Sequence, residues 1–352
     1  MVGAVWALVG LVPGAQTSLQ TAIALVVFAL PVLVLLAVWW QGWPFARLGR
    51  LGGGLVATAV LVGAALVLAL VSQAVTGKVD GGGLFATAPD LAKGTFAIFP
   101  FGFVLGGTVF VAMLQLTFVC GLEPLRRLPG RTGGLVAFAL SWGIGLLVYL
   151  TVANWDFVPA PARAAIGLRN PGGPVNALDL VGWLLCVVIW QVVLGILLNG
   201  WPFSRIPSLV TRLLVANVVT VGGGWLTYWL FQAGFGWDIP TIAAVGGCVS
   251  AAVLLQAMLF ETWPFRGPNP TANRIGLLVS AAVLTVVLYY ALRAVGNAVQ
   301  VWNEYPMNLW VAGGALDLIA TFVIVHYAIW GRWPFGPPSP PPAVDSPEVS
   351  QA

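Results

Sequence analysis

The sequence predicts an all-α, polytopic transmembrane helix bundle with nine full spans and a short N-terminal helix. Hydrophobic residues make up 59% of the 352 residues and charged residues only 7%, whereas a soluble domain carries about 25% charged residues. The apolar residues are collected into runs of about 20, the length that an α-helix needs to cross the hydrocarbon core of a bilayer. Strands of a transmembrane barrel would be shorter and would alternate with polar residues.

Each predicted span is an apolar run between polar or Pro- and Gly-rich connections. In chain order the runs cover residues 18–40, 51–75, 96–120, 134–153, 180–198, 209–233, 239–260, 275–292 and 309–330. Residues 1–12 are also apolar, but as a helix they reach only about 18 Å and are too short to cross. They lack a basic start, which argues against a secretory signal. We expect them to be the end of the first hairpin's first helix.

A short motif follows every second span. Its copies are Trp43-Pro44-Phe45, Trp201-Pro202-Phe203, Trp263-Pro264-Phe265, Trp333-Pro334-Phe335 and the degenerate Glu123-Pro124-Leu125. The steps between copies are 80, 78, 62 and 70 residues, enough for two spans and two connections. We therefore expect one transmembrane domain, residues 1–335, built from about five parallel two-helix hairpins. The approximate units are 1–45, 51–125, 134–203, 209–265 and 274–335.

The distribution of charge predicts the orientation of the chain. Ten arginines lie on the side of the motifs, and five basic residues lie on the opposite side. The positive-inside rule then places the motif side and the C-terminus in the cytoplasm, with the chain in the cell membrane. Residues 336–352 are Pro-rich and are expected to be a disordered cytoplasmic tail. The net charge of +4 reflects this topology, so the partner that we expect is the lipid bilayer and not a nucleic acid.

The motif tryptophans are expected to anchor helix ends at the headgroup level. They are Trp43, Trp201, Trp263 and Trp333. Proline lacks an N–H and ends a helix, and amphipathic aromatic rings are enriched at the membrane–water interface. The alternative is that the motifs form a cytoplasmic docking ring for a partner protein.

A second recurring pattern lies on the opposite side, ahead of the second helix of three hairpins. Its residues are Trp155, Asp156, Trp237, Asp238, Trp302, Asn303 and Glu304. In the simpler interpretation the Asp and Asn side chains cap helix starts and the Trp side chains are interfacial anchors. In the functional interpretation they surround an outer mouth, where carboxylates and Trp faces would attract a cation or an amine.

A third set of polar residues falls inside the predicted spans, where burial in hydrocarbon is costly. These residues are Asp317, His326, Gln256, Gln191, Gln115 and Asn217. Hydrogen bonds between helices are the simpler explanation of the glutamines. For Asp317 we favour a function, because an intramembrane carboxylate is expensive. Asp317 and His326 are nine residues apart and therefore point to opposite faces of a straight helix.

The sequence contains no motif that identifies an enzyme. It has one histidine and three cysteines, and their spacing does not match a zinc or copper site. No cofactor, metal or catalytic residue is therefore expected. The glycine pairs within the spans are most simply explained by close approach of helices.

Two functions from different classes remain, with an intramembrane enzyme third. The first is a transporter or channel for a small molecule or ion, with a pathway lined by the polar residues of the second helices. The alternative is a non-catalytic scaffold or anchor that docks partner subunits on its motif and arginine face. A transporter requires a polar path from the outer mouth to Asp317 or His326. A scaffold requires a dry interior and an exposed apolar flank.

Overall fold

The computed structural model describes residues 16–86, 89–129, 131–299 and 306–332. About 75% of the chain is helical, which confirms the predicted all-α class. Eight helices in the described residues are long and apolar enough to cross a membrane. The remaining predicted span, residues 18–40, corresponds to α2 and the π-helical segment that follows it, and in the part whose side chains are described Leu25–Trp39 forms an apolar helix. Nine spans therefore stay a prediction, and residues 1–12 and the tail lie outside the described residues.

The helices follow the predicted runs closely. Their bounds are α2 Gln16–Val34, α3 Gly49–Thr76, α4 Phe101–Leu114, α5 Thr132–Val152, α7 Ala177–Trp190, α8 Leu209–Trp229, α9 Ile239–Leu254, α10 Pro270–Val299, α11 Met307–Gly313 and α12 Thr321–Ile324. A π-helical segment, η10 (Gly314–Ala320), joins α11 to α12, so the three form one continuous rod.

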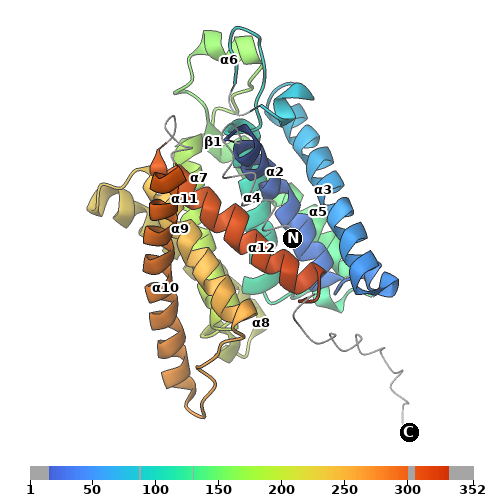
Figure 1. Ribbon diagram of the computed structural model, residues 1–352, viewed down its shortest axis with the longest axis vertical. Helices are drawn as coiled ribbons and strands as arrows, with labels where there is room; N and C mark the ends of the chain where they lie inside the picture. The colour runs from blue at the N-terminus through green and yellow to red at the C-terminus, as the bar shows by residue number, and fades with distance from the viewer. Residues whose placement is uncertain (1–15, 87–88, 130, 300–305, 333–352) are drawn as a thin grey trace.

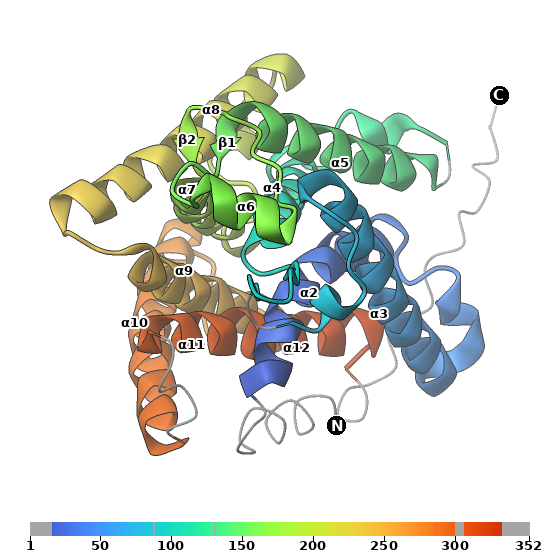
Figure 2. The same ribbon diagram turned by 90° about the horizontal axis from the view of Figure 1, so that it is seen from above.

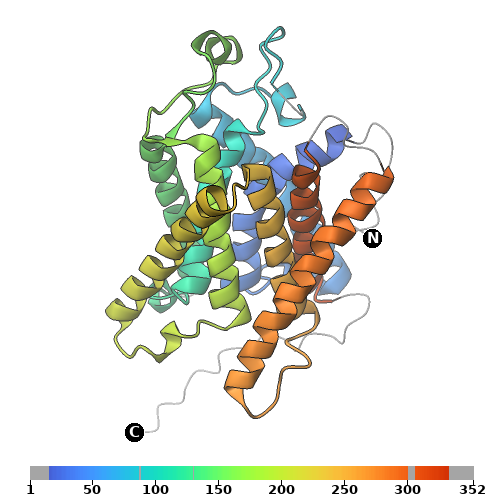
Figure 3. The ribbon, with the colours of Figure 1, turned by 90° about the vertical axis from the view of Figure 1, so that its left-hand side faces the viewer.

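The helices divide into an inner and an outer set. In α9, 67% of the span is buried, against 17% in α10, the helix that follows it. The inner helices are α2, α4, α7, α9 and the α11–α12 rod, and the outer helices are α3, α5, α8 and α10. Figure 3 shows α8 and α10 on the outside of the bundle, inclined to the inner helices. Because lipid tails are as apolar as the core, the outer set exposes Leu and Val side chains.

The inner helices form a closed ring. Contacts run from α2 to α4, from α4 to α7, from α7 to α9 and from α9 to α11, and η10 returns to α2. Figure 2, which views the molecule from above, shows this ring with the outer helices around it. Each outer helix packs on the inner helix that precedes it in the chain: α3 on α2, α5 on α4, α8 on α7 and α10 on α9.

Glycines permit the closest of these helix contacts. A Cβ atom on Gly145 of α5 would lie 2.8 Å from the backbone N and Cα of Val109 in α4. Gly224 of α8 has the same relation to Val187 of α7, also at 2.8 Å. Small residues allow helix backbones to approach in this way. The predicted role of the glycines in close packing is therefore seen at Gly224, and Gly145 makes the same kind of contact without belonging to a glycine pair.

The inner helices share one type of ending at the motif side. Each finishes in a π-helical turn: η1 Leu35–Trp39, η4 Gln115–Val119, η6 Gln191–Leu197, η9 Leu255–Leu259 and η11 Val325–Ile329. The next backbone N–H donates to the carbonyl five residues earlier, as from Trp40 to Leu35 and from Phe260 to Leu255, both at 2.9 Å. The chain then turns through the motif into a 3₁₀-helix in three places: η2 Phe45–Leu48, η5 Leu125–Arg127 and η7 Phe203–Arg205.

Two long connections form a cap over one part of the opposite end (Figure 1). The first follows α3 and contains η3 (Gly82–Leu84). The second follows α5 and contains α6 (Ala160–Ile166) and two short parallel strands, β1 (Ala153–Asn154) and β2 (Val175–Asn176). The backbone N–H of Arg169 donates to the carbonyl of Thr76 at 2.9 Å, which ties the second connection to the end of α3.

Candidate functional site

Asp317 lies near the midpoint of its span. It occupies the middle of η10, ten residues after the start of α11 at Met307 and twelve before the end of η11 at Ile329. Its side chain is buried, with 8% of the residue exposed. None of the hydrogen bonds or ion pairs among the described residues involves its carboxylate. Single π-helical turns inside α-helices are frequent at functional sites.

The only histidine is separated from this carboxylate. His326 lies in η11, nine residues beyond Asp317, which is about 13 Å along a helix axis. Its ring stacks on Phe322, with ring centroids 5.8 Å apart. The structure therefore does not join these two groups into one site.

Three of the other intramembrane candidates, Gln115, Gln191 and Asn217, form a hydrogen-bond network between three helices. Gln191 donates from Nε2 to Oε1 of Gln115 at 2.7 Å, and Gln115 donates to Oδ1 of Asn217 at 3.0 Å and to Oγ1 of Thr220 at 2.7 Å. Asn217 in turn donates to the Leu213 carbonyl at 2.7 Å. These contacts join the ends of α4 and α7 to the outer helix α8. They fit the simpler interpretation, in which the glutamines hold helices together.

Gln256 stands apart from that network. It is buried in η9, and its Nε2 donates to the carbonyl of Trp263 at 3.3 Å, within its own motif turn. It also lines an open groove of about 840 Å³ between η9 and α10, whose other lining residues are almost all apolar.

The inner helices share a cluster of buried apolar side chains. Val34, Met113, Val188 and Val253, one from each of α2, α4, α7 and α9, belong to a single buried cluster. Met113 and Val253 are fully buried. In the described residues one packed apolar cluster therefore joins these four inner helices.

Trp155 does not face an outer mouth. Its side chain is fully buried in a cluster of α4, α5 and α7. The indole Nε1 donates to the Tyr149 hydroxyl at 3.1 Å, and its ring meets Phe101 edge to face with centroids 5.0 Å apart. The tryptophan is thus a core residue beneath the cap.

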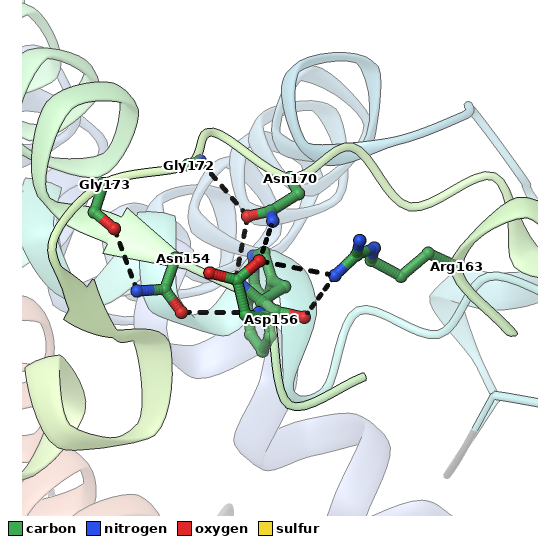
Figure 4. Close-up of polar contacts among 7 residues, drawn as sticks. Asn154, Asp156, Arg163, Asn170, Gly172 and Gly173 are labelled. Carbon is green, nitrogen blue, oxygen red and sulfur yellow. Dashed lines mark hydrogen bonds and ion pairs between the residues drawn. The ribbon is translucent and has the colours of Figure 1, made fainter. Parts of the chain in front are cut away.

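Asp156 is exposed, but its carboxylate binds groups of its own connection (Figure 4). Asn170 donates to Oδ1 at 2.7 Å, and the Arg163 guanidinium lies 3.7 Å from the same oxygen. Arg163 also donates to the Trp155 carbonyl at 2.8 Å. The cap fold accounts for this carboxylate.

The second Trp-Asp pair belongs to a different part of the molecule. Trp237 packs against Phe231 and Phe235, with centroids 4.7 and 5.5 Å away. Asp238 caps the start of α9 by accepting from the backbone N–H of Thr241 at 2.9 Å, as its simpler interpretation predicts. Trp302, Asn303 and Glu304 lie outside the described residues. No hydrogen bond, ion pair or ring contact among the described residues joins the two described pairs, and a shared vestibule stays a prediction.

The motif tryptophans differ in their surroundings. Arg131 lies 4.1 Å from the ring centre of Trp43, and Arg274 lies 4.9 Å from that of Trp201. Trp263 is 67% exposed. Trp333 lies outside the described residues. An interfacial anchor role fits all three described rings, and two of them also bind an arginine from the start of an outer helix.

Sequence reasoning missed a polar clamp in the cap. Asp80 accepts from the backbone N–H groups of Phe96 at 3.0 Å and of Gly83 at 3.1 Å. Chiefly because of the bond from Phe96, the pKa of Asp80 is lowered. Buried Gln73 bonds both the N–H and the carbonyl of Asp80, each at 2.9 Å. The pattern in the sequence that could have indicated this clamp is a glutamine near the end of a span, followed seven residues later by an aspartate.

Among the residues that the structure describes, no three His, Cys, Asp or Glu side chains are grouped so that they could bind a metal ion. Comparison of the chain with protein-family models, with curated proteins and with solved structures finds no match.

Proposed function

We propose that this chain is a non-catalytic scaffold of the cell membrane that assembles partner subunits on its motif face. The observation that carries this proposal is the buried apolar cluster to which Val34, Met113, Val188 and Val253, one residue from each of four inner helices, belong. A solute path between these helices would have to displace these side chains. The exposed aromatic residues at the end of α9 supply the apolar flank that a scaffold requires.

The proposal includes the predicted repeat and orientation. The shared π-helical endings support an origin in about five hairpin units. Ten arginines on the motif side, against five basic residues opposite, favour a cytoplasmic motif face. A basic cytoplasmic face can bind both anionic lipid headgroups and acidic surfaces of partner proteins.

Proton or cation transport is the second candidate, and Asp317 favours it. A carboxylate at the middle of a span is a functional-site hypothesis by default, and Asp317 also lies in a π-helical segment. In this candidate Asp317 binds the proton or cation, and movement of the α11–α12 rod opens the path.

The mass of the protein in gently solubilised native membranes tests the scaffold proposal. We expect a complex well above the 37.0 kDa of one chain. Replacing three exposed motif-side arginines together (Arg47→Gln, Arg126→Gln and Arg205→Gln) should release the partner. The matched control is Lys93→Gln, an exposed basic residue of the cap, which should leave the complex intact.

The Asp317→Asn variant separates the two candidates when it is examined both in solubilised membranes and after reconstitution into vesicles. Asp317→Asn should leave the complex intact if the chain is a scaffold, and proteoliposomes should show no proton or cation flux beyond that of empty vesicles. A 37.0 kDa monomer in native membranes would contradict the scaffold proposal. So would a flux that Asp317→Asn abolishes.

A further inference from the structure

A carboxylate at the start of α7 lies beside an aromatic cluster at the end of α8. Asp179 Oδ1 accepts a hydrogen bond from the Tyr228 hydroxyl at 2.8 Å. Tyr228 belongs to a buried cluster against which Phe231 and Trp237 pack. The span of α7 begins two residues before Asp179, and that of α8 ends with the π-helical η8 (Leu230–Gly234), so the site lies at the membrane surface opposite the motifs. This end of α8 lies at the edge of the molecule (Figure 2).

Three aromatic rings meet where α8 leads into α9. The ring centroids of Phe231, Phe235 and Trp237 are 4.7, 5.5 and 6.2 Å apart in pairs, and the ring planes are tilted by 32–38°. The backbone N–H of Trp237 donates to the Phe231 carbonyl at 2.9 Å, which holds the turn together. Phe235 is 59% exposed. Because the face of an aromatic ring carries partial negative charge, such a cluster attracts cations.

Two carboxylates accompany these rings. Asp179 is partly buried and Asp238, which follows Trp237, is exposed. None of the salt bridges among the described residues includes either aspartate. A carboxylate that is partly withdrawn from water costs free energy unless it is paired. The hydroxyl of Tyr228 supplies a hydrogen bond to Asp179 but no positive charge.

The other described Trp-Asp pair shows how the chain itself can supply the cation. Asp156 lies 3.7 Å from the Arg163 guanidinium, and the neighbouring Trp155 is fully buried. At the end of α8 the described residues provide rings and carboxylates without such a guanidinium. The charge of this site is therefore complementary to a cation from outside the chain, at the depth where lipid headgroups lie.

We propose that this site binds phosphatidylethanolamine from the adjacent leaflet. The ammonium group donates to Asp179, the headgroup carbons lie against the rings of Phe235 and Trp237, and an acyl chain follows exposed apolar side chains of α8 such as Leu226. A primary ammonium fits better than a quaternary one, because its N–H groups donate charge-assisted hydrogen bonds to a carboxylate. This inference goes beyond the proposed scaffold function and concerns the opposite face.

Native mass spectrometry of the full chain, purified in detergent and titrated with single lipids, tests the proposal. The probes are phosphatidylethanolamine and phosphatidylglycerol with identical acyl chains. We expect Asp179→Asn to raise the Kd for the first bound phosphatidylethanolamine about five- to tenfold, because a neutral amide attracts an ammonium far less than a carboxylate does. The Kd for phosphatidylglycerol should not change. The Asn oxygen can still accept from Tyr228, so the fold is retained. Phe235→Leu should weaken phosphatidylethanolamine binding about two- to fivefold.

The matched control is Asp90→Asn, which removes a carboxylate of the cap that already lies 3.4 Å from Lys93. It should leave both Kd values unchanged. Phosphatidylethanolamine binding that Asp179→Asn does not weaken, or an equal loss of both lipids, would overturn the proposal. Equal affinity for phosphatidylcholine would do the same, because choline has no N–H to donate. Free ethylammonium that binds as tightly as the lipid would assign the site to a soluble amine instead. Because the purified chain is used alone, the result does not depend on the scaffold function.

Discussion

Two glycines on α5 provide a sharp test of the helix packing. A Cβ atom on Gly145 would approach the Val109 backbone to 2.8 Å, whereas a Cβ atom on Gly143 would meet nothing within 4 Å. Alanine is therefore substituted at each position separately. The residues share one helix and one substitution, so the variants differ mainly in what the new methyl group meets.

The expected magnitudes follow from two opposing effects. Alanine favours the helix over glycine by roughly 0.5–1 kcal/mol at either position. At Gly145 the methyl group must separate α4 from α5, because carbon atoms pack at about 3.5–4.0 Å. Backbone atoms cannot rotate away, and such overpacking costs about 1–3 kcal/mol. We expect Gly143→Ala to be slightly stabilised, and Gly145→Ala to be less stable than Gly143→Ala by about 1–3 kcal/mol.

Unfolding in mixed micelles by increasing SDS, followed by tryptophan fluorescence, measures the difference in free energy of unfolding. The same comparison on α8, Gly224→Ala against Gly222→Ala, repeats the test at the equivalent contact, because a Cβ atom on Gly222 also meets nothing within 4 Å. If Gly145→Ala proved as stable as Gly143→Ala, the close approach of α4 and α5 would be refuted.

Three further outcomes are expected. Folding lowers the pKa of Asp80, so the stability that this carboxylate gives to the cap is fully present above the unfolded pKa of 3.8 and is lost as pH falls through the folded pKa. Amide exchange in the cap, corrected for intrinsic rates, should therefore accelerate as the pH falls through that range. Asp80→Asn should remove this pH dependence. Gln191→Leu should lower the free energy of unfolding by about 0.6–1.7 kcal/mol, and adding Gln115→Leu should cost less than in the wild-type background, which a double-mutant cycle measures. Tyr149→Phe should lower the free energy of unfolding in SDS by about 1–3 kcal/mol, because it leaves the buried indole N–H of Trp155 without its acceptor; an unchanged free energy of unfolding would contradict this bond.

The positions of the spans could be predicted because hydrocarbon requires long apolar helices. The predicted run 209–233 corresponds to Leu209–Gly234, and 239–260 corresponds to Ile239–Leu259. The division into inner and outer helices could not be predicted in the same way, because a lipid-facing side chain and a core side chain are both apolar. Burial in the folded structure is what separates α9 from α10.

The candidate site was predicted only in its parts. The cost of polar groups in hydrocarbon indicated that Gln115, Gln191 and Asn217 need partners, but not that they are one another's partners. The rule that tryptophan marks the membrane interface failed for Trp155, because the following connection folds over it and buries it. Such long-range contacts depend on how the two cap segments meet, which local patterns do not encode.

The ring also determines when its parts can be completed during synthesis. Each outer helix docks on an inner helix that the ribosome has already made, so most of the bundle can assemble in order as it enters the membrane. The seam is different: η11 must meet α3, and Arg50 must donate to the Gly331 carbonyl, across 281 residues. Until translation reaches that last rod, the earliest helices wait in the bilayer with one flank open, and this is where a membrane chaperone would be needed.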